Sequence, residues 1–142
     1  MSDIPTTPIL PAVSIIVGYL KTQEAVTDLV GDRIAHKTPE TLDRPWVRIT
    51  QLDARNESGT REVEHLVSYY LQLDAYAGKA NRYTEVEDLS IAVRAALVVI
   101  TRAQLEGAVA TDVGFLSMPS DPDPDEGRER IITDCEIFMH PR

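Results

Sequence analysis

The sequence has few of the residues from which catalytic and metal sites are usually built. It contains one cysteine, three histidines and seven glycines. The histidines are His36, His65 and His140, which form no pair four residues apart and have no cysteine at metal-ligand spacing, so a zinc site is not expected. The glycines are dispersed and form no phosphate-binding loop, and no serine lies in a nucleophile-elbow context. The sequence therefore predicts no enzyme, no metal ion and no cofactor.

Positive charge and long apolar segments are also scarce. Lysine and arginine number 14 against 23 aspartates and glutamates, which gives a formal charge of −9 and a pI near 4.7. Such an acidic chain has little general affinity for nucleic acid or for an anionic membrane. The most apolar run, residues 91–100, contains Arg94 and is much shorter than the roughly 20 residues needed to cross a bilayer. We therefore expect a soluble protein.

The length and the single cysteine indicate one intracellular domain. A chain of 142 residues can bury a core without disulfides or metal ions and has no room for a second domain. Cys135 cannot form an internal disulfide, and its alternating apolar context is typical of a small buried residue, which suits a reducing cytosol. Residues 1–10 lack the basic start of a signal peptide and contain Pro5 and Pro8, so an extended arm is expected there.

Hydrophobic spacing predicts an α+β domain. A helix is expected over residues 11–21, and a short second helix ends at Gly31. Alternating side chains predict strands over residues 46–52 and 65–77, and two further strands over 109–118 and 130–139. This order predicts an antiparallel sheet of about four to five strands with two or three helices packed on it.

A long amphipathic helix is expected between the second and third of these strands, at residues 85–100. Its second half is apolar nearly all round, which is typical of a helix covered on more than one side. Either another subunit or a packed N-terminal helix could supply the second cover.

Two charged hairpin loops are the candidate contact regions. The loop at residues 53–64 mixes acidic and basic side chains, and the loop at 119–128 alternates aspartate with proline. An acid/base pair in the first loop and a calcium site in the second are conceivable, but neither pattern fits its chemistry, and solvated loop tips are favoured. Tyrosines on the polar side of the strand at 65–77 could also face a partner. The predicted interface residues are Arg55, Glu57, Arg61, Glu62, Tyr70, Tyr76, Asp121, Asp123 and Asp125.

Two motifs carry a resemblance to a known family. They are the helix exit Leu29-Val30-Gly31-Asp32-Arg33-Ile34, in which residues 32–34 form a short strand, and the strand start Pro45-Trp46-Val47-Arg48-Ile49. Together with the strand at 65–77 and the helix at 85–100, they resemble the tail terminator, or tail-completion, proteins of long-tailed phages.

The resemblance implies a structural virion protein that forms a ring, a hexamer in that family, on the end of the tail tube. Such a ring ends tube polymerisation and offers a surface for head–tail joining. Its partners would be other copies of itself, the tail tube protein and the head–tail connector, with DNA passing through the lumen without specific binding. Assembly in the host cytoplasm and a final place in the tail or neck of the virion follow. Another neck or head-closure protein, a tail tube protein or a small acidic binding module are the alternatives.

Overall fold

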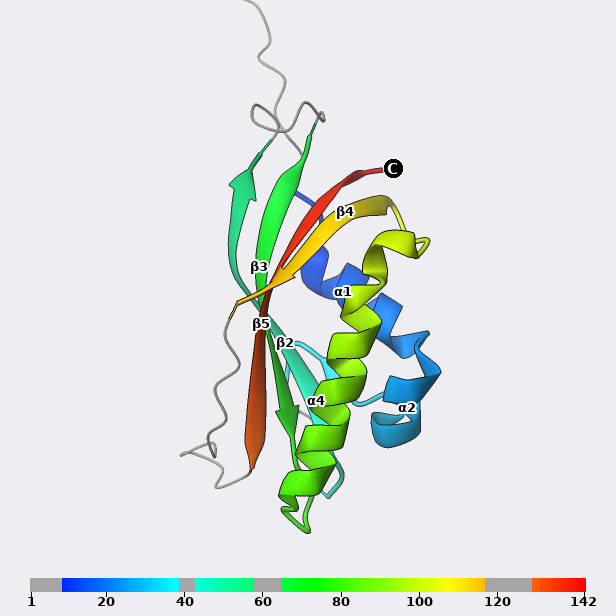
Figure 1. Cartoon of the computed structure of the whole chain (residues 1–142), viewed down its shortest axis with the longest axis vertical. Coiled ribbons are helices and arrows are strands. Elements are labelled where there is room, and N and C mark those ends of the chain that lie inside the picture. The colour runs from blue at the N-terminus through cyan, green and yellow to red at the C-terminus, as the bar shows by residue number, and fades with distance from the viewer. Residues whose placement is uncertain (1–8, 39–42, 58–64, 117–128) are drawn as a thin grey trace, which may run out of the picture.

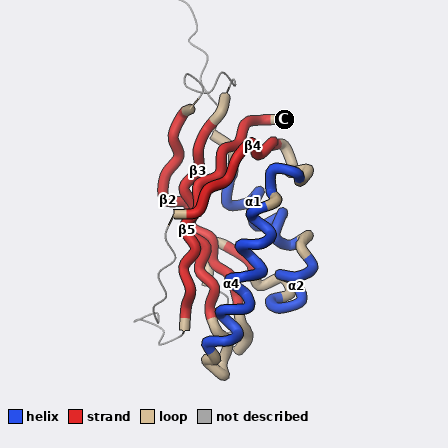
Figure 2. Tube along the Cα trace, in the orientation of Figure 1, coloured by secondary structure: helices blue, strands red, loops and turns tan. Residues whose placement is uncertain are grey.

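The computed structural model describes residues 9–38, 43–57, 65–116 and 129–142. Most of the N-terminal arm and large parts of both predicted loops lie outside these ranges. The described residues form one sheet with all of the helices on one of its faces (Figure 1). Strands and helices therefore make two layers, as Figure 2 shows by colour. The predicted α+β class is confirmed.

The sheet has five strands in the order β1-β2-β3-β5-β4. The strands are β1 Ile34–Ala35, β2 Trp46–Asn56, β3 Val67–Tyr76, β4 Ala108–Phe115 and β5 Arg130–Pro141. All neighbours pair antiparallel except β1, which runs parallel to β2. The sheet is thus mixed rather than wholly antiparallel, because the short strand expected at residues 32–34 is found at Ile34–Ala35 and runs beside β2 in the same direction.

The helical layer confirms the two predicted N-terminal helices and the long third one. The helices are α1 Ala12–Lys21, α2 Glu24–Val30 and α4 Tyr83–Val98, followed by the 3-10 turn η1 Ile100–Arg102. The chain leaves α2 through Gly31, whose φ of +58° is readily available to glycine. Tyr19 of α1 reaches across to α4, where its hydroxyl donates a hydrogen bond of 2.5 Å to the carbonyl oxygen of Ala96. This bond satisfies a carbonyl near the end of α4.

The core lies between the sheet and the helices. Alternate residues of β3 point into it, as predicted: Val67, Tyr69, Leu71, Leu73 and Ala75 are all buried. α4 contributes its own buried stripe, of which Val93 is only 2% exposed. Burial of these two faces is the main source of stability.

α4 is covered on more than one side, as expected, but its outer side is exposed. α1 and α2 pack beside this helix, yet Ile91 is 61% exposed, Val98 55% and Val99 40%. The apolar positions thus remain uncovered within one chain. An N-terminal helix covers one flank of α4 and leaves this one open.

Candidate interaction surface

The face of the sheet that the helices leave free carries a dense set of polar side chains. Strand pairing orders them into rows that cross the sheet from β2 to β4. One row holds Arg55, Ser68, Phe138 and Asp112. The next row contains Asp53, Tyr70, Glu136 and Gly114. We call this face, with its rows, the open face.

One end of the open face is a packed aromatic and cationic cluster. Trp46 and Tyr76 are paired across β2 and β3, and their rings stack with centroids 4.6 Å apart and planes 7° from parallel. The guanidinium of Arg48 lies 5.1 Å from the Tyr76 ring centroid, and Arg130 lies 5.9 Å from it. Arg48 also donates a hydrogen bond to the Tyr76 hydroxyl. The Tyr76 side chain is fully buried, and its partners come from β2 and β5 on either side of β3, so the cluster stabilises the packing of these three strands.

A buried carboxylate continues the cluster toward the middle of the face. Asp74 is 1% exposed, and Arg48 Nη2 lies 3.4 Å from its Oδ2. The amide of Gln72 also donates to Asp74, at 3.0 Å to Oδ1. On the adjacent strand, burial raises the pKa of Asp134, and the charge of Asp74 raises it further. Within the described residues, Asp134 Oδ1 is buried and has no hydrogen-bond partner.

The other end of the open face, which we call its accessible end, centres on the half-buried Tyr70 and the exposed Arg55 and Asp53, although Ser68 and Phe138 there are buried. Arg55 lies with its guanidinium 5.1 Å from the Tyr70 ring centroid and bonds Asp53 through Nε at 3.1 Å. The Tyr70 hydroxyl donates a hydrogen bond to the Glu136 carboxylate, which raises the pKa of Tyr70. Glu57 accepts a 3.2 Å hydrogen bond from Ser68 Oγ. This arrangement offers a partner both charge signs and an aromatic ring.

The predicted interface residues divide into three groups. Arg55, Glu57 and Tyr70 are brought together at the accessible end of the open face. Tyr76 does not belong with them, because it lies six residues along β3, roughly 20 Å away at the usual strand rise, and is 0% exposed. Its expected place at a partner surface is therefore wrong for the single chain.

The remaining predicted residues lie outside the described ranges: Arg61, Glu62, Asp121, Asp123 and Asp125. Glu136 is the member of the accessible group that sequence reasoning missed. The alternation of residues 130–139 puts it on the polar side of its strand, but only the β3–β5 register reveals that it faces Tyr70.

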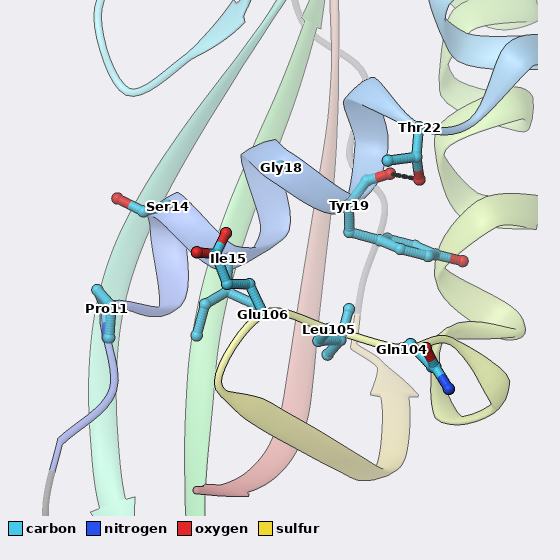
Figure 3. Close-up of a pocket in the computed structure, with 9 residues that line it drawn as sticks. All are labelled: Pro11, Ser14, Ile15, Gly18, Tyr19, Thr22, Gln104, Leu105 and Glu106. Atoms are coloured by element: carbon cyan, nitrogen blue, oxygen red, sulfur yellow. Dashed lines mark hydrogen bonds between the residues drawn. The ribbon is translucent and has the colours of Figure 1, made fainter. Parts of the chain in front are cut away.

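A groove of about 460 Å³ lies on the helical side, between α1 and the loop that leads into β4. In Figure 3, α1 lies along one wall of the groove and the loop at residues 104–106 along the other. Tyr19 and Glu106 are the ionisable residues of this lining, and burial raises the pKa of Tyr19. The groove thus presents mainly apolar and hydroxyl groups. Its lining residues are Pro11, Ser14, Ile15, Gly18, Tyr19, Thr22, Gln104, Leu105 and Glu106.

Cys135 lies inside the core, where burial raises the pKa of its thiol to about 12. In the ranges that the structure describes, no three His, Cys, Asp or Glu side chains are close enough together to hold a metal ion. None of the helices in these ranges is both long and apolar enough to cross a membrane.

Comparison with known proteins identifies a matching protein family. Residues 15–140 match the family described as "Tail completion protein gp17". Among solved structures, a chain from the "Virion of native gene transfer agent (GTA) particle" superposes with a TM-score of 0.74 at 16% sequence identity. The match covers 92% of this chain and 99% of that chain, so the two share a fold over nearly their full lengths. A search of curated proteins found no match.

Proposed function

This chain belongs to the tail completion protein gp17 family, and we propose that it forms a ring on the end of a phage tail tube. There it would stop polymerisation of the tube and present a surface to the head–tail connector. The family is one of structural virion proteins, and the chain is a structural protein of the phage tail, located in the tail or neck of the virion.

The observation that carries the proposal is the extent of the family match. Residues 15–140 run from within α1 to the last residue but one of β5, so the match includes both the helical layer and the sheet. The similar chain from the gene transfer agent is matched over 99% of its length and is part of a virion. A subunit of this size and architecture is therefore compatible with assembly into a particle.

The open face supplies a chemically suitable docking surface. Interfaces favour tyrosine and arginine at their centres, and the accessible end of the face presents Tyr70 and Arg55 together. Glu57 and Glu136 add acidic groups beside them. We propose that this group contacts the tail tube protein or the connector.

The charge of the chain favours a lumen through which DNA moves freely. Each copy has a formal charge of −9, so a ring of copies is strongly acidic. Phosphate groups are repelled by such a surface, and no bound counterions are released to favour binding. DNA would therefore pass through the ring without being held.

The test is assembly of the purified protein alone and with tail tubes. Light scattering over a range of concentrations gives the mass of the assembly, and negative-stain imaging shows its shape. Rings that cap tube ends would support the proposal. A monomer that ignores tubes would refute it and favour a binding module, and rings that stack into tubes by themselves would favour a tube subunit.

A double variant sharpens the test of the docking surface. Replacing both Arg55 and Tyr70 by serine removes the guanidinium and the ring from the accessible end of the face. We expect this variant to leave tube ends uncapped. The matched control replaces two exposed acidic residues of α4, Glu87 and Asp88, by serine, and it should cap tubes normally.

A further inference from the structure

We infer that neighbouring copies in the ring join edge to edge, the outer edge of β2 in one copy pairing with the outer edge of β4 in the next. The sheets would then continue from subunit to subunit through backbone hydrogen bonds. This inference rests on the proposed ring and specifies the surface that closes it. Its partner is a second copy of this chain.

In the part of the chain that the structure describes, both strands have long outer edges with no strand beside them. β1 pairs with β2 only as far as Arg48, so residues 50–56 have no strand outside them among the described residues. β4 is the last strand at the opposite side of the sheet, as Figure 2 shows. Each edge also carries an exposed leucine, Leu52 at 57% and Leu116 at 60%. Free edges of this length are templates for pairing with another strand.

Backbone groups at both edges point outward at regular intervals. Directly after β2, the amide of Glu57 donates to the carbonyl oxygen of Leu66, the residue before β3, at 2.7 Å. Alternation then directs the backbone groups of Ala54 away from the sheet. Directly after β4, the amide of Leu116 donates to the carbonyl oxygen of Asp134 in β5, and the same alternation directs the backbone groups of Val113 outward. In the single chain the outward amides of Ala54 and Val113 donate to the carboxylates of Asp53 and Asp112, at 2.8 and 2.9 Å. Pairing would exchange these two bonds for bonds to a neighbouring strand, and the outward carbonyl oxygens are the acceptors that such a strand needs.

Strand direction fits a head-to-tail contact. β2, β3, β5 and β4 reverse direction at each step across the sheet, so β2 and β4 run antiparallel to each other. The rotation that relates neighbouring copies has its axis nearly parallel to the strands, so each strand keeps its direction from one copy to the next. β2 of one copy therefore meets β4 of the next as an antiparallel pair. Antiparallel pairing is the slightly more stable arrangement.

The register follows from the rows of the open face. A closed ring has no net rise from one copy to the next. When the strands run nearly parallel to the ring axis, the two ends of one row lie at the same height, so the end of a row in one copy meets the opposite end of the same row in the next copy. Arg55 and Asp112 are the two ends of the row that includes Ser68 and Phe138. Their opposite charges would face each other, and the same register brings the outward backbone groups of Ala54 and Val113, which lie between the two rows, opposite each other. Charge and hydrogen bonding thus select the same register.

A twofold contact would leave half of the β2 and β4 edges unpaired. Pairing of β2 with β2 joins two copies and leaves both β4 edges open, and pairing of β4 with β4 leaves both β2 edges open. A head-to-tail contact uses one edge of each kind at every interface and closes when the rotation is complete. Only this arrangement pairs the outer edge of β2 beyond Arg48 and the outer edge of β4 at every interface of a ring.

Mixed disulfide cross-linking tests the contact directly. Two proteins are prepared, Arg55→Cys and Asp112→Cys, mixed before assembly and oxidised. Opposed residues at a non-hydrogen-bonded antiparallel site have Cα atoms about 4.5 Å apart, within the range of about 4.4 to 6.8 Å that a disulfide spans. We expect covalent dimers in the mixture and none in either protein alone, read by non-reducing gel and mass spectrometry. The native Cys135 is buried and does not compete.

A matched pair controls for chance encounters. Asp28→Cys on α2, mixed with Asp112→Cys, should give no dimer, because α2 packs against α1 and α4 and not along the β2 or β4 edge. Dimers from Arg55→Cys alone would indicate a twofold β2 contact and overturn the inference. Rings in which the Arg55→Cys and Asp112→Cys proteins fail to cross-link would also overturn it while leaving the proposed function intact. A wild-type chain that forms no ring would overturn both.

A proline substitution provides an independent readout. The amide of Val47 points away from β3 and donates to the carbonyl oxygen of Arg33, just before β1, at 2.9 Å. Alternation along β2 points the amide of Gln51 in the same outward direction. Gln51→Pro therefore removes an outward N–H and keeps the bonds to β3. We expect loss of rings with an unchanged far-UV circular dichroism spectrum, whereas Gln51→Ala should assemble. Rings formed by a folded Gln51→Pro protein would contradict the pairing.

Discussion

Two tyrosines on the same side of β3 provide a direct test of how the open face is built. Tyr76 is fully buried against Trp46 and two guanidinium groups, whereas Tyr70 is only partly covered. Truncating a buried aromatic ring to alanine typically costs about 3–5 kcal/mol. Tyr76→Ala should therefore lower the free energy of unfolding by about that amount, and Tyr70→Ala by about 1 kcal/mol or less.

Tyr76→Phe separates the ring from the hydroxyl. The phenylalanine ring keeps the stack on Trp46 but cannot accept the hydrogen bond from Arg48. Hydrogen bonds to charged groups contribute about 1.5–3 kcal/mol. Since the Arg48 side chain is 26% exposed and can bond water instead, we expect the loss to be near the lower limit of that range.

Urea unfolding measures all three variants. With a denaturant slope of about 2 kcal/mol/M, Tyr76→Ala should shift the midpoint by about 2 M. Trp46 is the single tryptophan of the chain, so its fluorescence reports on this cluster, and circular dichroism reports on the whole domain. Coincident transitions would confirm two-state unfolding. Equal losses for Tyr70→Ala and Tyr76→Ala would refute the division of the face into a structural and an accessible end.

Three further predictions concern the core, a carboxylate and a turn. Val93→Asp should abolish folding, measured by circular dichroism, because it buries an unpaired charge, while Ile91→Asp on the exposed side of α4 should leave the fold intact. Asp134→Asn should raise the thermal midpoint at pH 7 and reduce the gain in stability on acidification, because the native carboxyl has a raised pKa and binds protons more tightly than the unfolded one. An unchanged pH profile would mean that Asp134 is solvated. Gly78→Ala should lower the midpoint of thermal unfolding, since the new Cβ would lie 2.7 Å from a backbone oxygen of the loop before β2; a neutral effect would show that this loop moves aside easily.

Much of the fold could be predicted because local pattern and burial agree. In β3 every second side chain is apolar, so period-two alternation alone identified the core side. Gly31 and the apolar stripe of α1 likewise located the first two helices. These features depend on residues close in sequence, which is why they can be read without knowing the tertiary structure.

The errors arose where the decisive contact lies far away in the sequence. Residues 53–56 are polar and were expected in a loop, but pairing with β3 extends β2 to Asn56 through a bulge near Leu52. Tyr76 is on the polar side of its strand, yet the register places Trp46 beside it and two arginines around it. Register between strands, and therefore the composition of the open face, could not be obtained from alternation within either strand.

The proposed edge contact and the accessible end of the open face are adjacent, so assembly would affect both. Asp53 and Gly114 end the row that contains Tyr70 and Glu136. In the ring, Gly114 of the next copy would lie opposite Asp53, and a glycine has no side chain to displace the Asp53–Arg55 pair. Among the described residues nothing lies within 4 Å of a Cβ built on Gly114, so these residues leave room for a neighbour at this end of the row. Ring closure would thus place the tyrosine, arginine and carboxylate groups of successive copies side by side in one continuous band around the ring, of which a single subunit carries only one segment.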